Sequence, residues 1–215
     1  LGYPPSTSPF NRVAIIGFRN VGSHAAKFLK HKGFNIVAIS DVNGGVYCPD
    51  GISLETLNRI KTPADIEKGI KISNEEMLGL DVDIIVPAAL ENYITGENAD
   101  KVKARIILEG ANGPTTPEAD TIFKQKGVLV IPDILANAGG VSVSFFEWSR
   151  NQGHIDERIP VGQKTAGIVR EEEVLEAMGK MMEYSAEKVF AYSQKYKVDL
   201  RLAAYILGME RIAPL

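Results

Sequence analysis

Five short apolar runs recur along the first two thirds of the chain, each bounded by Gly, Pro, Asp or Asn. Their hydrophobicity is continuous rather than alternating, which is typical of strands buried on both faces of a parallel sheet. The stretches between them read largely as helices. The runs occupy residues 13–16, 36–39, 84–86, 106–108 and 128–131. The pattern predicts an α/β fold with a doubly wound, mostly parallel sheet.

Helical patterns fill the middle and the end of the chain. Residues 53–80 are rich in Glu and Lys and read as short helices, with Pro63 starting one and Asn74 capping another. A loop at about 153–167 precedes closing helices that start at about residue 170. The first of these has an apolar face made of Val174, Met178, Met181, Met182, Ser185, Val189, Tyr192 and Tyr196. A last helix at about 200–212 stops at Pro214 and carries Ala203, Ala204, Leu207 and Met209.

The first apolar run leads into a loop between two glycines, Gly17-Phe18-Arg19-Asn20-Val21-Gly22, and then into a helix at about 23–32. The amide groups at the start of such a helix can receive a phosphate. Asp41, about 20 residues beyond the glycines, ends the second run, where a carboxylate can accept ribose hydroxyls. This arrangement indicates a Rossmann-type dinucleotide-binding domain. In the alternative interpretation, Gly17 and Gly22 only permit tight strand-to-helix packing, and Asp41 is a turn residue.

Arg19 occupies the place of the middle glycine of the dinucleotide fingerprint. Its side chain is expected to crowd the approach of the pyrophosphate, unless the guanidinium pairs with a phosphate oxygen instead. Asp41 would repel the 2′-phosphate of NADP, and Arg19 is a nearby cation that could offset this repulsion. The sequence therefore leaves the choice between NAD and NADP open.

Two loops that follow apolar runs, 112–120 and 137–144, are rich in amide-bearing and hydroxyl-bearing residues. With them, residues from about 12 to 151 resemble the cofactor-binding domain of glutamate dehydrogenases. The segments that carry the resemblance are VAIIGFRNVGSHAAKFL, VAISDVNGGVYCPDGI, DIIVPAALENYITGENADKVKARIILEGANGPTTPEAD and GVLVIPDILANAGGVSVSFFEW. Residues after about 172 fit the closing helices of the family more loosely. The resemblance implies one NAD(P)-binding domain at 12–215, preceded by a linker at 1–11.

The resemblance also implies contacts with the cofactor from the pyrophosphate, through the adenosine ribose and the adenosine half, to the nicotinamide. The residues that would face the pyrophosphate are Gly17, Phe18, Arg19, Asn20, Val21 and Gly22. Asp41 and Val42 would lie near the adenosine ribose, and Ala88 and Ala89 would lie against the adenosine half. Asn112 and Asn137 would hold the nicotinamide and its ribose. Val141 and Ser144 would line the substrate pocket, with the Ser144 hydroxyl as a donor to the distal carboxylate of glutamate. Neutral amides fit the nicotinamide because they orient its carboxamide without adding a charge.

Several of these residues have an ordinary structural alternative. Asn112 can be a turn former before a Gly-Pro pair. Asn137 can mark the N-terminus of a helix. The hydroxyl of Ser144 can bond back along its own helix. Cys48 lies far from any second thiol and has no assigned role, and no metal site is expected from the scattered His24, His31 and His154.

By resemblance, the expected reaction is the reversible oxidative deamination of L-glutamate to 2-oxoglutarate and ammonia. The family's catalytic lysine and aspartate belong to an N-terminal domain, which is expected to be absent from this chain. The chain alone should then bind without turnover, and its parent is expected to be a homo-oligomer. Two alternatives stay open, a dehydrogenase of apolar amino acids and a catalytically empty regulatory relative that binds a dinucleotide.

Composition excludes several other classes of protein. The 215 residues include 24 Lys and Arg against 27 Asp and Glu, a net charge of −3 with both signs interspersed, so no nucleic-acid footprint is present. The single cysteine excludes an internal disulfide framework. No apolar run approaches the roughly 20 residues of a membrane span, and no signal peptide is recognisable at the start. A cytoplasmic protein with no membrane or nucleic-acid partner is expected.

Overall fold

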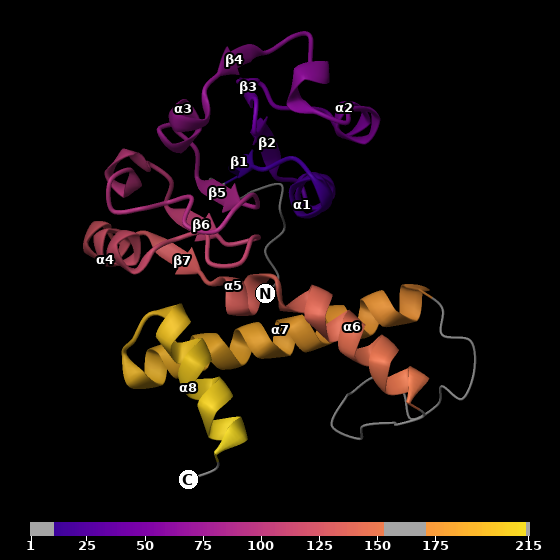
Figure 1. Cartoon of the computed structure of the whole chain (residues 1–215), viewed down its shortest axis with the longest axis vertical. Helices are drawn as coiled ribbons and strands as arrows, with labels where there is room; N and C mark the ends of the chain where they lie inside the picture. The colour runs from indigo at the N-terminus through magenta and orange to yellow at the C-terminus, as the bar shows by residue number, and fades with distance from the viewer. Residues whose placement is uncertain (1–10, 153–170, 214–215) are drawn as a thin grey trace. The chain divides into compact units, whose positions relative to one another are not determined.

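The computed structural model describes residues 11–152 and 171–213. Nearly all of the expected linker at 1–11, the loop at 153–167, His154 and Pro214 lie outside the described residues. The chain divides into two compact units, Leu1–Asp133 and Ile134–Leu215. The first contains a seven-stranded sheet in the order β4-β3-β2-β1-β5-β6-β7 (Figure 1).

Five of the strands pair in parallel and confirm the five predicted runs. They are β1 (Arg12–Ile16), β2 (Asn35–Asp41), β5 (Ile84–Pro87), β6 (Ile106–Leu108) and β7 (Leu129–Ile131). Two antiparallel strands, β3 (Gly44–Tyr47) and β4 (Ile70–Ile72), extend the sheet beyond β2. The helical interpretation of 53–80 was therefore wrong at β4, where three residues in a charged segment pair with β3. The chain passes from β1 to β2 on one side and returns to β5 on the other, which is a doubly wound arrangement.

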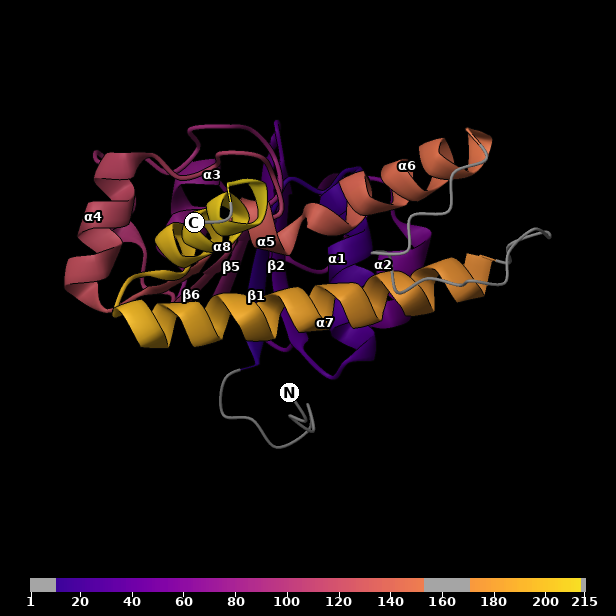
Figure 2. The same cartoon turned by 90° about the horizontal axis from the view of Figure 1, so that it is seen from below.

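Helices cover both faces of the sheet. In both views α1 and α2 lie to the right of the strands, and α3 and α4 lie to the left (Figures 1 and 2). Helices α1 (Asn20–His31) and α2 (Leu54–Arg59) pack on one face, where Val13 and Ile15 of β1 are buried. Helices α3 (Asn74–Leu78) and α4 (Pro117–Lys126) pack on the other, over Ala14 and Ile16. Burying one such isoleucine side chain contributes about 1.5–3 kcal/mol. The continuous apolar runs are thus strands buried on both faces, as predicted.

The segment between β2 and β5 contains short helices whose ends are set by polar caps. The turn η2 (Pro63–Asp65) begins at Pro63, as predicted. Helix α3 is capped by Ser73, not by Asn74, because the Ser73 hydroxyl accepts from the Glu76 amide at 3.2 Å and the Glu76 carboxylate accepts from the Ser73 amide at 2.7 Å. This reciprocal pair also lowers the pKa of the Glu76 carboxyl. The Asn74 side chain instead donates to the Asp41 carbonyl at 3.0 Å, across to the end of β2.

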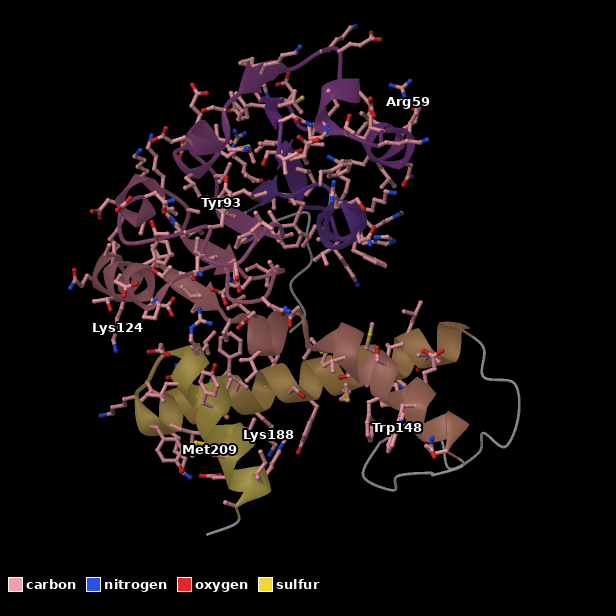
Figure 3. All side chains as sticks on the ribbon, in the orientation of Figure 1. Arg59, Tyr93, Lys124, Trp148, Lys188 and Met209 are labelled. Carbon is pink, nitrogen blue, oxygen red and sulfur yellow. The ribbon has the colours of Figure 1, made fainter. Side chains whose placement is uncertain are left out.

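The second unit contains the helices α6 (Ala138–Asn151), α7 (Glu171–Tyr196) and α8 (Leu200–Ile212), as Figure 1 shows. Helix α8 packs on the end of α7, where the Tyr192 hydroxyl donates to Glu210 at 2.7 Å. Its buried residues are Leu200, Ala203, Ala204 and Leu207. Met209, also carried by this helix and labelled in Figure 3, is 68% exposed, because a position two residues beyond Leu207 points away from the buried stripe.

Helix α7 spans the predicted long helix, and its apolar face is half-buried rather than buried over most of its length. Val189 is its buried residue among those described, and Tyr196, at the last turn, is exposed. The described residues also include two short elements, η3 (Ala99–Lys101) and α5 (Asp133–Ala136). In the described ranges, every helix is too short or too polar to cross a bilayer.

Candidate functional site

The loop after β1 is anchored to the end of β2. Gly17, at φ +96°, and Phe18 both donate their amides to the Ser40 carbonyl, at 2.9 and 2.7 Å. The Phe18 ring is 3% exposed and belongs to the core on the α1 side of the sheet. Of the six predicted pyrophosphate residues, Gly17 and Phe18 therefore have their amides engaged inside the protein. The exposed part of the loop is Arg19, Asn20 and Val21.

Helix α1 begins at Asn20, three residues earlier than its predicted start near 23, and packs very closely on this loop. A Cβ atom at Gly22 would lie 1.9 Å from the Gly17 carbonyl oxygen, so only glycine fits there. Gly22 therefore has the packing role that was its structural alternative. This close packing also places the first turn of α1 directly against the end of β1. Amides of a first helical turn have no intrahelical acceptor, and Arg19 makes no side-chain cap, so this turn can accept an anion.

Arg19 is exposed and has φ −113° and ψ −148°. The φ angle is negative, so Arg19 does not occupy the left-handed region that favours glycine. Its effect on a ligand therefore depends on the side chain alone.

Three loops meet beside the first turn of α1. The Ala88 amide donates to the Ile16 carbonyl at 2.7 Å, and a Cβ atom at Gly17 would lie 2.8 Å from the Ala88 carbonyl carbon. Gly110, after β6, lies between the Ala88 and Val21 side chains, since its own Cβ would be 3.3 Å from each. Gly110 was not among the predicted site residues. The signal that could have found it is a glycine directly after an apolar run.

Asp41 ends β2 and is half-buried, and Val42 beside it is 77% exposed. One Asp41 carboxylate oxygen accepts from the Asn43 amide at 2.8 Å, which is the geometry of an Asx turn. Asp41 is thus a turn residue, as its structural alternative predicted. A carboxylate has about four lone-pair sites, so this bond leaves acceptor capacity for a ligand.

Asn112 is exposed in the loop between β6 and α4. The next residue, Gly113, is in the left-handed region at φ +52°, a backbone conformation that glycine adopts readily in tight turns. The predicted residues 17–22, 41–42, 88–89 and 112 lie at or just after the carboxyl ends of β1, β2, β5 and β6. Carboxyl ends of parallel strands lie at one edge of a sheet, so the fold brings these residues to the same edge.

Asn137, Val141 and Ser144 belong to the second unit. Asn137 directly precedes α6, in agreement with its alternative as a helix N-terminus signal. The Ser144 hydroxyl donates to the Gly140 carbonyl at 3.2 Å, which is the predicted back-bonding alternative. Val141 is 70% exposed, and Ser144, three residues further along the helix, is also exposed. The two side chains lie on the same part of α6.

A separate cavity of about 590 Å³ lies beside the amino end of β2, where the Cys48 amide donates to the Val37 carbonyl. Two of the polar groups that line it bond to each other, the Ser53 and Thr56 hydroxyls, at 2.9 Å. Burial raises the pKa of the Cys48 thiol, so this cysteine is a poor nucleophile. Arg59, labelled in Figure 3, also lines the cavity.

Comparison with known proteins identifies the family. A sequence profile of the Glutamate/Leucine/Phenylalanine/Valine dehydrogenases matches residues 7–215. The chain belongs to this family. It is 47% identical over 206 residues to the glutamate dehydrogenase of Thermotoga maritima and 44% identical to an NAD-specific glutamate dehydrogenase of Staphylococcus aureus. Both alignments cover 94% of this chain and 47% of the relative.

Solved structures of this dehydrogenase family share the fold. A hetero-hexameric glutamate dehydrogenase from Thermus thermophilus, in a leucine-bound form, superposes with a TM-score of 0.80 at 29% identity. The superposition covers 94% of this chain and 45% of that one. The chain thus spans about half the length of the relatives it matches. The Rossmann-type fold and the glutamate dehydrogenase resemblance expected from the sequence are both confirmed.

Proposed function

We propose that this chain is the cofactor-binding part of an NAD(P)-dependent glutamate dehydrogenase, which deaminates L-glutamate oxidatively and reversibly to 2-oxoglutarate and ammonia. The observation that carries the proposal is the open first turn of α1 at the meeting point of the loops after β1, β5 and β6. Open α/β sheets bind dinucleotides outside the carboxyl ends of their strands, where this turn lies. The relatives named above, at 44–47% identity, support glutamate as the substrate.

In this proposal the pyrophosphate binds over Arg19, Asn20 and Val21, where amides and the N-terminal end of the α1 dipole favour a negative charge. Gly17 and Gly22 make this possible by bringing the helix and the strand together, and Phe18 supports the loop from the core. Asp41 accepts from the adenosine ribose beside Val42. Ala88 and Ala89 are small enough for the adenosine half to lie against them.

The nicotinamide half is held by Asn112 and Asn137, whose amides orient the carboxamide of the ring. When bound, the nicotinamide supplies or accepts the hydride. Val141 lines the substrate side-chain pocket, and Ser144 donates to the distal carboxylate of glutamate. For that bond the Ser144 hydroxyl must rotate away from the Gly140 carbonyl, which it can do because the side chain is exposed.

The chemistry also needs groups that polarise the keto acid and move protons. In the family resemblance these are a lysine and an aspartate of an N-terminal domain, and the matched relatives are about twice as long as this chain. The proposed role of the present 215 residues is therefore binding and positioning within a larger, oligomeric enzyme. By themselves they bind a dinucleotide and do not catalyse the reaction.

Calorimetric titration with NAD and with NADP, followed by a turnover assay with glutamate, tests this function. We expect one site per chain for at least one dinucleotide and no reduction above a buffer blank. Absence of binding to both dinucleotides would contradict the cofactor role. Steady reduction of either cofactor by the purified 215-residue chain would show that the catalytic groups are present here after all.

A further inference from the structure

The loop that carries Asn112 is held from two sides through Gly113. The Gly113 carbonyl accepts from the Asn92 amide at 2.8 Å, on the loop that follows β5. The Gly113 amide donates to the Asp133 carboxylate at 2.7 Å, on the segment that follows β7. A bond to an ionised acceptor is stronger than a neutral one. The position of Asn112 therefore depends on a carboxylate 20 residues further along the chain than Gly113.

Asp133 is itself held by a second carboxylate. The backbone amide of Asp133 donates to Glu109 Oε2 at 2.8 Å, and the Glu109 amide donates to the Ile131 carbonyl at 3.1 Å. Glu109 is fully buried directly after β6, three residues before Asn112. A buried carboxylate is costly unless it is hydrogen-bonded, so a structural or functional reason is needed to keep it there. Fixing the end of β7 against the end of β6 is such a reason.

We infer that Asp133 is a positioning residue for the nicotinamide half of the cofactor, which acts through Gly113 on Asn112, and that Glu109 positions Asp133. The inference rests on the proposed function, because it takes Asn112 as a nicotinamide contact. Neither carboxylate touches the cofactor in this role. The adenosine half is bound by the loops after β1, β2 and β5, so loss of Asp133 should weaken only one end of the ligand.

The test compares Asp133→Ala and Asp133→Asn in the 215-residue chain, by titration with NAD and with ADP-ribose, which lacks the nicotinamide ring. Asp133→Ala should lower the affinity for NAD by about fivefold or more, the equivalent of one lost hydrogen bond. Its affinity for ADP-ribose should stay within about twofold of the unaltered chain. Asp133→Asn keeps an acceptor oxygen and should restore most of the NAD affinity.

Hydrogen exchange of the Gly113 amide gives a second measurement that needs no ligand. Exchange should be about tenfold faster or more in Asp133→Ala and close to unaltered in Asp133→Asn. An equal loss of affinity for both ligands would assign Asp133 a general structural role and overturn the inference. Unchanged NAD affinity in Asp133→Ala would overturn it too. If the unaltered chain binds neither ligand while the Gly113 exchange responds as expected, the proposed function fails, and the positioning role fails with it.

Discussion

Asp41 combines a turn bond and a proposed ligand bond in one carboxylate. Its oxygen that accepts from the Asn43 amide shapes the end of β2, and the remaining acceptor sites can receive two ribose hydroxyls. The Asn74 side chain fixes the same strand end from α3. A residue in this position can serve the fold and the ligand at once, so the turn geometry does not decide between the two interpretations. A binding measurement does.

Replacing Asp41 with Ser should weaken NAD binding and spare or improve NADP binding. The substitution removes a charged acceptor for the ribose, at a cost of about 1.5–3 kcal/mol, and it removes a repulsion with the 2′-phosphate. Serine can still accept from the Asn43 amide, which protects the turn. Calorimetric titration with each cofactor measures the effect. Unchanged affinity for both would reduce Asp41 to a turn residue.

The Arg19 side chain can act on a bound dinucleotide in two ways, as a steric block or as a phosphate contact. We expect Arg19→Gly to tighten dinucleotide binding with little change in salt dependence, because removal of the side chain lets the pyrophosphate approach the backbone amides. A flexible arginine would also have to be ordered to help. Arg19→Ala is the matched control and should behave almost like Arg19→Gly. Weaker binding and a shallower salt dependence in both variants would instead identify a contact between the guanidinium and a phosphate.

At the scale of the element, the contact between α1 and β1 depends on the absence of a side chain at Gly22. Gly22→Ala should destabilise the chain by about 1–3 kcal/mol, the usual cost of overpacking, and should weaken dinucleotide binding as α1 moves away. Gly208→Ala, in α8, is the matched control because a Cβ atom there meets nothing within 4 Å. It should stabilise the chain by up to about 1 kcal/mol. Chemical denaturation of both variants measures this, and equal stability of the two would contradict the packing argument.

The elements that could be predicted from the sequence are those with a strong local pattern. Continuous apolarity predicted β1, β2, β5, β6 and β7, and the loop between the two glycines marked the start of α1. Strand β3 was missed because two of its four residues are glycines, which are depleted in strands. Strand β4 is three residues long and has an exposed lysine at its centre. Such a segment becomes a strand only because β3 is available to pair with it.

The site was partly predictable for a similar reason. Spacing along the chain identifies Gly17, Gly22 and Asp41, because the fingerprint is local. Glu109 and Asp133 could not be found in this way, since their bonds join residues 24 and 20 positions apart. Their positions become meaningful only when β6 and β7 lie side by side in the sheet.

At the scale of the whole molecule, the proposed binding groups belong to the two units of this chain. The proposed catalytic groups belong to the half of the relatives that this chain does not match. The residues proposed to contact the phosphates and the adenosine belong to the first unit together with Asn112, and Asn137, Val141 and Ser144 belong to the second. Cofactor affinity should therefore reside mainly in residues of the first unit, and amide chemical shifts can locate it there residue by residue.

Amide chemical-shift mapping of the 215-residue chain during titration with NAD or NADP shows where a dinucleotide binds. The largest shifts should fall on Asn20, Val21 and Gly22, with further shifts at Ala88 and Gly110, while the cavity lined by Cys48 and Arg59 stays unchanged. Shifts confined to that cavity, or saturation with either cofactor without any change in the first turn of α1, would contradict a site at the carboxyl ends of the strands.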